Sequence, residues 1–111
     1  MSTKNSLLLA DRAALVTGGA GRLGRVIAAT LQREGAKVVI ADIDRHRLAE
    51  VTALLSKAAK AHSVQADVSQ LQDAQKMVAR AESLAGPIDI LVNAHGIVPV
   101  KSFLEIGRAH V

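Results

Sequence analysis

The glycines between Thr17 and Gly24 have the spacing of a loop that could bind a phosphate group. In this stretch, T-G-G-A-G-R-L-G, the template G-x-G-x-x-G begins at Gly19 and T-G-x-x-G-x-x-G begins at Thr17, whereas T-G-x-x-x-G-x-G meets Arg22 where a glycine is usual. Glycine lets a backbone approach a ligand closely, and a helix that begins here presents unpaired N–H groups to an anion. The pattern indicates either a dinucleotide site or an ordinary glycine turn between a strand and a helix.

Asp42 lies eighteen residues after Gly24, at the end of an apolar run. An acid about 20 residues beyond such glycines can accept hydrogen bonds from the hydroxyls of an adenosine ribose. Its charge would oppose a 2′-phosphate, so the sequence favours NAD over NADP, with the Arg22 guanidinium as the competing feature. The alternative is that Asp42 caps the next helix, a position for which Asp44 is better placed.

Asp67 ends another short apolar stretch. It either accepts a hydrogen bond from an adenine amino group or makes the turn before a helix. His95 could act as a general acid or base, but no partner acid or nucleophile is identifiable beside it, so we interpret it as a spectator. The other histidines, His46, His62 and His110, have no metal-ligand spacing, and we expect no metal site.

Four stretches, at 9–16, 37–42, 61–66 and 88–92, predict strands, of which 61–66 has the weaker pattern. Continuous apolar runs such as 37–42 are typical of strands that are buried on both faces of a parallel sheet. Three stretches with helical periodicity lie between them. The first ends near Gly35, the second covers 45–60, and the third begins at Ser69, which forms a capping box with Gln72, and stops at Gly86-Pro87. Their predicted inner faces are Leu23, Ile27 and Leu31; Leu48, Val51, Leu55 and Ala58; and Leu71, Ala74, Met77, Ala81 and Leu84.

The order βαβαβαβ predicts a three-layer α/β fold with a Rossmann-type parallel sheet of strand order 3-2-1-4. Ligands bind such sheets beyond the carboxyl ends of the strands, near the point where the strand order reverses. The glycine loop, Asp42, Asp67 and Asn93 all fall at carboxyl ends. This convergence favours the dinucleotide site over the simple turn.

Composition narrows the class of protein. The 111 residues suit one small domain, half of them are hydrophobic, and there is one Phe but no Tyr, Trp or Cys. The net charge of +4 is spread along predicted helices without interleaved aromatic residues, so we expect no nucleic-acid partner. No apolar run approaches ~18 residues. We therefore expect a cytoplasmic protein without a membrane segment.

Four stretches in order resemble the short-chain dehydrogenase/reductase family: L-V-T-G-G-A-G-R-L-G, V-V-I-A-D-I-D, A-D-V-S and D-I-L-V-N-A-H-G-I. The resemblance assigns site residues by position. The pyrophosphate would be lined by Gly18, Gly21, Arg22, Leu23 and Gly24. The ribose would be met by Asp42 and Ile43, and the adenine would be flanked by Asp67 and Val68. Along the middle of the cofactor would lie Asn93, Ala94 and Gly96.

The chain departs from the family in two places. The single-domain branch usually reads N-N-A-G where this chain has Asn93 to Gly96, and the glycine loop also fits the extended branch; the stretch D-I-L-V-N-x-x-G favours the single-domain branch. The family's catalytic Ser and Tyr-x-x-x-Lys have no counterpart, because the chain has no Tyr. We therefore expect no catalytic residue within it.

The resemblance implies a parent NAD(P)-dependent oxidoreductase that transfers hydride between nicotinamide and a small alcohol or ketone, acting as a homo-oligomer. There are two alternatives. One is a 3-oxoacyl-thioester reductase of the same family, which acts on substrates carried by acyl carrier protein, and the other is a non-catalytic dinucleotide-binding or sensing module.

We expect residues 1–105 to be a partial NAD(P)-binding Rossmann domain. Residues 106–111, I-G-R-A-H-V, resemble a translated sequencing adapter and are expected to be non-native; a genuine short protein with a chance tail is the alternative.

Overall fold

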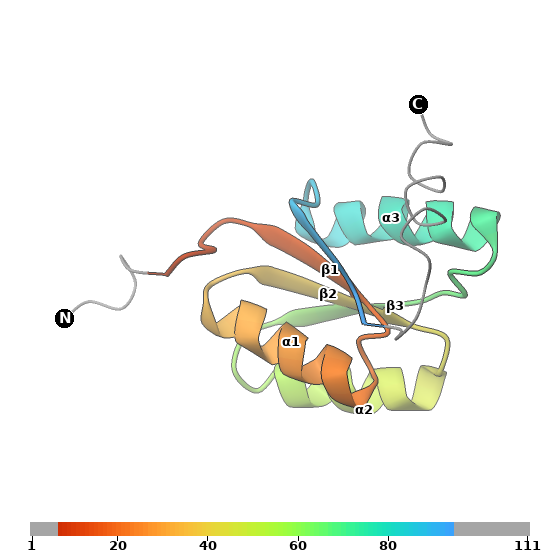
Figure 1. The fold of residues 1–111 in the computed structure, drawn as a ribbon. Coiled ribbons are helices and arrows are strands. Elements are labelled where there is room, and N and C mark those ends of the chain that lie inside the picture. The colour runs from red at the N-terminus through yellow and green to blue at the C-terminus, as the bar shows by residue number, and fades with distance from the viewer. Residues whose placement is uncertain (1–6, 95–111) are drawn as a thin grey trace.

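The computed structural model describes residues 7–94, which form a four-stranded parallel sheet between two layers of helix (Figure 1). The strand order is β3-β2-β1-β4, as the sequence predicts. The elements are β1 Ala13–Thr17, α1 Arg22–Arg33, β2 Lys37–Asp42, α2 Arg45–Leu55, β3 Ala61–Gln65, α3 Leu71–Ala85 and β4 Ile90–Asn93.

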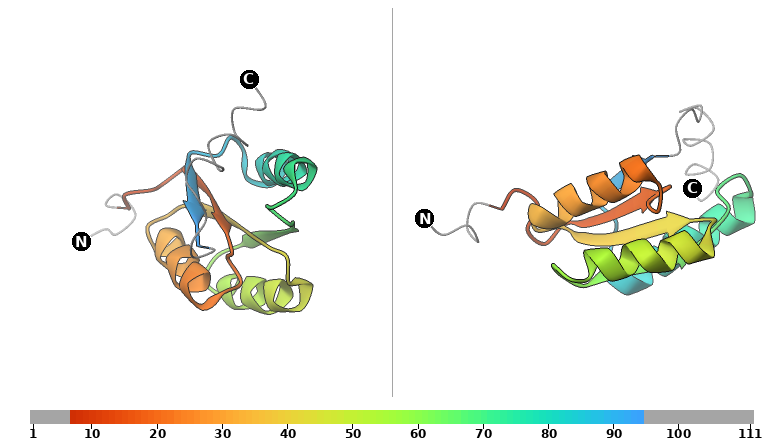
Figure 2. Two further views of the ribbon diagram at one scale, coloured as in Figure 1. Left: turned by 45° about the vertical axis from the view of Figure 1, so that its right-hand side comes forward. Right: turned by 90° about the horizontal axis from the view of Figure 1, so that it is seen from below.

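The apolar runs of β1 and β2 supply the core on both faces of the sheet. Successive side chains of a strand point to opposite faces, so Val16 and Ile40 pack on one side and Leu15 and Val39 on the other. The helices α1 and α2 cover the first face and α3 covers the second (Figure 2). Both faces of β1 and β2 are therefore covered, and because the two strands are parallel their carboxyl ends lie at the same edge of the sheet.

The predicted helices are present, with differences at their ends. The second helix ends at Leu55 rather than at residue 60, and Ala58 is exposed. The predicted inner-face residues Leu23 and Leu71 are 60% and 47% exposed. Both lie in the first turn of a helix at the carboxyl edge of the sheet, where the described part of the chain leaves them uncovered. In α3, Ala85 is buried and Leu84 is half-buried.

The caps of α2 and α3 differ in how well the sequence predicted them. Asp44 caps α2, since its carboxylate accepts a hydrogen bond from the Arg47 N–H at 3.1 Å, and Asp42 does not serve as that cap. The predicted capping box of Ser69 and Gln72 is wrong. The N-cap is Gln70 and the helix begins at Leu71, two residues after Ser69, because the Ser69 N–H and hydroxyl both donate to Asp67 instead.

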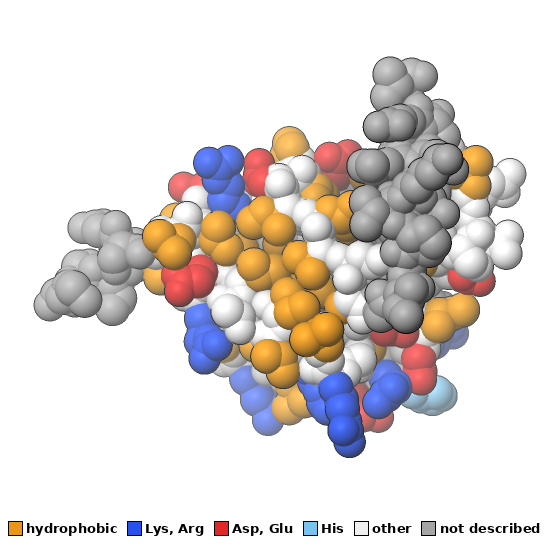
Figure 3. All heavy atoms as spheres, viewed as in Figure 1, with side chains coloured by type: hydrophobic (Ala, Val, Ile, Leu, Met, Phe, Trp, Pro, Cys, Tyr) orange, Lys and Arg blue, Asp and Glu red, His pale blue; other side chains and the backbone are white. Residues whose placement is uncertain are grey.

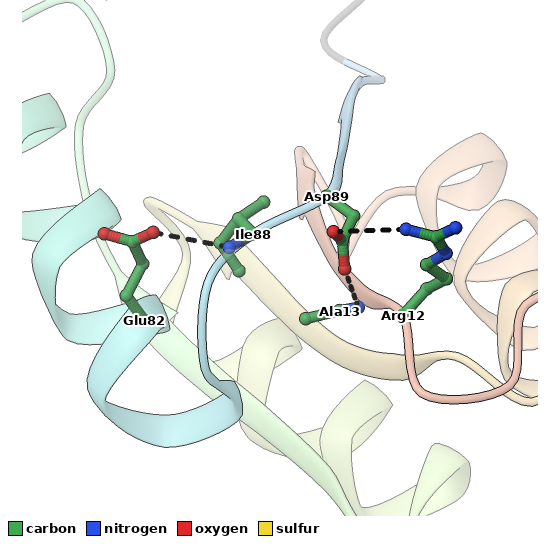
Figure 4. A network of polar contacts seen from close by, with 5 residues as sticks. All are labelled: Arg12, Ala13, Glu82, Ile88 and Asp89. Carbon is green, nitrogen blue, oxygen red and sulfur yellow. Dashed lines mark hydrogen bonds and ion pairs between the residues drawn. The ribbon is translucent and has the colours of Figure 1, made fainter.

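The amino-terminal ends of β1 and β4 are joined by a polar clasp (Figure 4). The Ala13 N–H donates to the Asp89 carboxylate at 2.9 Å, and the Asp89 N–H donates back to the Ala13 carbonyl at 2.9 Å. Arg12 adds an ion pair to Asp89 at 3.6 Å. The clasp sets the register in which Thr17 at the other end of β1 lies opposite Asn93.

The strand β4 forms one edge of the described sheet. Hydrophobic side chains gather in a band over this face of the molecule (Figure 3), and Leu91 on β4 is 51% exposed. Within residues 7–94, no helix is both long and apolar enough to cross a membrane.

Candidate functional site

The loop from Gly18 to Gly21 joins the carboxyl end of β1 to α1 and is tied to its neighbours by backbone hydrogen bonds. The Gly19 N–H donates to the Ala41 carbonyl at 3.1 Å, and the Ala20 N–H donates to Asp42 Oδ2 at 3.1 Å. Through these two contacts the loop is fixed to the end of β2. The predicted glycine run and the predicted acid are therefore side by side.

Three glycines, two in the loop and one in the first turn of α1, cannot be replaced without a change in the backbone or in the packing around them. Gly18 has a φ of 70°, a left-handed conformation that side chains rarely adopt. A Cβ on Gly24 would overlap the Gly18 carbonyl oxygen and lie 2.7 Å from the Gly19 Cα, and a Cβ on Gly19 would lie 2.6 Å from the Ile40 Cβ. The first turn of α1 can approach the loop closely only because these side chains are absent.

Gly21 precedes α1 as its N-cap and has no comparable constraint. Its Cβ would meet only the Gly18 carbonyl oxygen, at 3.4 Å, an ordinary contact. No side chain caps the helix, so the N–H groups of its first turn face the carboxyl edge of the sheet. Arg22 and Leu23 in this turn are exposed. An uncapped helix end beside a glycine loop suits an anionic group.

Asp42 is half-buried and already engaged. Its Oδ1 accepts from the Asp44 N–H at 3.0 Å, while Oδ2 accepts from Ala20. A carboxylate has about four lone-pair sites, so acceptor capacity remains for ribose hydroxyls. Ile43 beside it is 56% exposed, which leaves an apolar side chain next to the acid at the same edge.

Asp67 has the contacts of a turn residue. Its Oδ1 accepts from the Ser69 N–H at 3.0 Å and from the Ser69 hydroxyl at 2.6 Å, and its own N–H donates to Asp73 at 3.1 Å. These contacts belong to the turn that the sequence offered as the alternative, and they do not test a role toward adenine. Val68 packs against the hydrophobic cluster under α3.

Asn93 at the end of β4 is linked to β1. Its Oδ1 accepts from the hydroxyl of Thr17 at 3.2 Å, and the Thr17 side chain is fully buried. The Ala94 N–H donates to the Thr17 carbonyl at 2.9 Å. Asn93 and Ala94 thus lie beside the glycine loop at the point where the strand order reverses. His95, Gly96 and the tail 106–111 lie outside the described residues.

Sequence reasoning missed three contributors to this arrangement. Thr17 and Gly19 were parts of the templates without assigned roles, and the constraints on them depend on the neighbouring strands. Ala20 acts through its backbone N–H, for which a sequence has no signal. A groove of about 450 Å³ between α1 and α2 includes none of the predicted site residues.

A parallel sheet of this strand order, with a glycine loop after β1, is a Rossmann-type arrangement. A family model described as short chain dehydrogenase matches residues 12–111. The chain belongs to the short-chain dehydrogenase/reductase family.

The named relatives of the chain differ in their activities. The chain is 39% identical over 109 residues to the L-rhamnose 1-dehydrogenase (NAD(P)(+)) of Azotobacter vinelandii, and the matched region covers 92% of this chain and 42% of that protein. It is 37% identical over 102 residues to the acetoacetyl-CoA reductase of Allochromatium vinosum, covering 89% and 42%. The chain therefore spans about two fifths of the length of these relatives.

Solved structures agree with the fold. A complex of Pseudomonas aeruginosa RhlG with NADP has a TM-score of 0.75 at 33% identity, covering 95% of this chain and 42% of that chain. A short chain dehydrogenase from Mycobacterium smegmatis has a TM-score of 0.83 at 28% identity, covering 94% and 52%.

Proposed function

We propose that the chain is the dinucleotide-binding part of an oxidoreductase that transfers hydride between nicotinamide and a small alcohol or ketone. The observation that carries the proposal is the contact between the glycine loop and Asp42, from Ala20 N to Asp42 Oδ2 at 3.1 Å. It brings the proposed pyrophosphate and ribose sites to one edge. Residues 1–105 are the proposed domain, and 106–111 are proposed to be foreign to it.

Each part of the cofactor has proposed partners in the chain. The first turn of α1, from Arg22 to Gly24, offers N–H groups to the pyrophosphate, while Gly21 as N-cap and Gly18 let it approach. Asp42 and Ile43 meet the ribose, and Asp67 and Val68 flank the adenine. Asn93, Ala94 and Gly96 lie along the middle of the cofactor. When bound, the nicotinamide supplies the hydride chemistry.

We propose NAD as the preferred cofactor. If Asp42 meets the ribose as proposed, its carboxylate would repel a phosphate on the ribose 2′-hydroxyl. Arg22 is exposed and free to turn toward a phosphate, which is the feature that favours NADP. The test is a titration of the chain with both cofactors under the same salt. We expect tighter binding of NAD; tighter binding of NADP would overturn this preference.

We further propose that the chain alone binds without turnover. A proton donor positioned beside the substrate oxygen is needed for carbonyl reduction, and the family's Tyr is missing from all 111 residues. An assay for oxidation of a reduced cofactor with simple ketones tests this. Turnover that persists after further purification of the chain would contradict it.

One alternative for the parent protein is supported by a specific observation. The acetoacetyl-CoA reductase of Allochromatium vinosum is 37% identical, so a parent that reduces 3-oxoacyl thioesters is the second candidate. NADP is the more usual cofactor of that activity, and the acid at position 42 argues against it. The same titration with NAD and NADP separates the two.

A further inference from the structure

We infer that Asp42 is a positioning residue for the glycine loop, in addition to its proposed contact with the ribose. Its carboxylate joins two backbone segments, because Oδ2 accepts from the N–H of Ala20, twenty-two residues before Asp42, and Oδ1 accepts from the N–H of Asp44, two residues after it. The ribose role rests on the proposed function, whereas the positioning role is a property of the chain without cofactor.

The contact continues the pairing of β1 with β2 beyond the end of the strands. In that ladder Thr17 lies opposite Ala41, and the Gly19 N–H still donates to the Ala41 carbonyl at 3.1 Å. The next loop N–H, that of Ala20, finds the side chain of Asp42 instead of a main-chain carbonyl. The Asp42 carbonyl accepts from the Ala66 N–H on the other side, at 3.1 Å. The carboxylate thus takes the place of a backbone acceptor.

The position requires two acceptor atoms. Ala20 is buried, at 3% exposure, so leaving its N–H without a hydrogen-bond partner would lower the stability of the folded chain. An asparagine at position 42 has one acceptor oxygen and one NH₂ donor. It can satisfy either Ala20 or Asp44, and the other N–H would face a donor. Removing the charge in this way therefore also breaks one of the two hydrogen bonds that Asp42 accepts.

This arrangement changes what a cofactor-switching substitution should do. If Asp42 acted only by charge, Asp42→Ala would weaken NAD and tighten NADP. Because the carboxylate also holds the loop that would receive the pyrophosphate common to both cofactors, we expect Asp42→Ala, which keeps no side-chain acceptor, to weaken both. The matched control is Asp44→Asn, which removes the same charge from the same turn, keeps a good helix cap and does not touch the loop.

The first experiment needs no cofactor. Amide hydrogen exchange is measured residue by residue in the 111-residue chain, in Asp42→Ala, which keeps no side-chain acceptor, and in Asp44→Asn. We expect the Ala20 amide of Asp42→Ala to exchange about tenfold faster, the ratio for loss of one ordinary hydrogen bond, while the buried amides of β2 stay protected. Asp44→Asn should leave Ala20 unchanged. Unaltered Ala20 exchange in a folded Asp42→Ala variant would overturn the inference.

A second measurement covers the case in which Asp42→Ala does not fold. In the unmodified chain, scalar couplings across the hydrogen bonds should be detectable from the amide nitrogens of both Ala20 and Asp44 to the side-chain carboxyl carbon of Asp42. A role of Asp42 in general stability would not produce both couplings. A coupling to Asp44 without one to Ala20 would refute the contact with the loop.

The cofactor arm then separates the two claims. Loss of affinity for both NAD and NADP in Asp42→Ala, with Asp44→Asn unchanged, supports the positioning role. A gain in NADP affinity by Asp42→Ala would contradict it. If the unmodified chain binds neither cofactor, the proposed function fails, while the exchange and coupling experiments still decide whether Asp42 holds the loop.

Discussion

At the scale of residues, the four glycines between Thr17 and Arg25 are under different structural constraints. Gly18 is needed for its left-handed backbone, and Gly19 and Gly24 are needed because a Cβ would collide with packed neighbours. Gly21 meets none of these constraints. The spacing of glycines could not rank them, since two templates fitted the same eight residues and a third failed only at Arg22. The ranking comes from Ile40 and the backbone of Gly18 and Gly19, which the fold brings against them.

The difference gives a paired test by substitution. Gly24→Ala forces the first turn of α1 away from the backbone of Gly18 and Gly19, so we expect a loss of ~1–3 kcal/mol in the free energy of unfolding. Gly21→Ala has room for its methyl group and an ordinary φ of −76°, so its stability should be unchanged. Urea unfolding of the two variants measures both. Equal losses would show that the contact argument is mistaken.

At the scale of elements, the presence of each strand and helix was predictable, and most of their ends were not. The first strand was expected over 9–16 and is Ala13–Thr17, and the last was expected over 88–92 and is Ile90–Asn93. The apolar run 37–42 gave β2 with its bounds because a strand covered on both faces is marked throughout its length. The helix ends depend on local competition between hydrogen bonds. Asp44 was recognised as a cap, but Ser69 was assigned to α3 although Asp67 takes its N–H and hydroxyl.

The candidate site was predictable in its location and less so in its contacts. The rule that ligands bind beyond the carboxyl ends of parallel strands placed Asp42 and Asn93 near the glycine loop. It did not indicate that the Ala20 N–H would bind Asp42 or that the Thr17 hydroxyl would bind Asn93. Both contacts join segments far apart in the sequence and depend on strand register.

The clasp at the amino-terminal end of β4 gives a prediction for this element. Asp89→Ala removes the acceptor of the Ala13 N–H, so we expect it to lower the free energy of unfolding by about 1 kcal/mol. Arg12→Ala removes only an ion pair whose side chains are 61% and 37% exposed, and its effect should stay below ~0.5 kcal/mol. Chemical denaturation compares them. A larger effect of Arg12→Ala would mean that the ion pair, not the backbone contact, holds β4.

At the scale of the whole molecule, the described sheet has an apolar edge at β4. An exposed strand edge can pair with another chain, and Leu91 there is 51% exposed. We expect Leu91→Lys to reduce concentration-dependent self-association of the 111-residue chain. Leu54→Lys is the matched control, because Leu54 is equally exposed, at 54%, but lies on α2. Sedimentation over a range of concentrations measures both, and equal effects would argue against association through the edge.

The central claim is that a dinucleotide binds at the carboxyl edge of the sheet. The most direct measurement is an NMR titration of the isotope-labelled chain with NAD, in which the amide shift changes are mapped onto the fold. We expect the changes at Gly18 to Gly24, Asp42 and Ile43, Asp67 and Val68, and Asn93 and Ala94. Changes confined to the groove between α1 and α2, or no change at saturating NAD, would contradict the account.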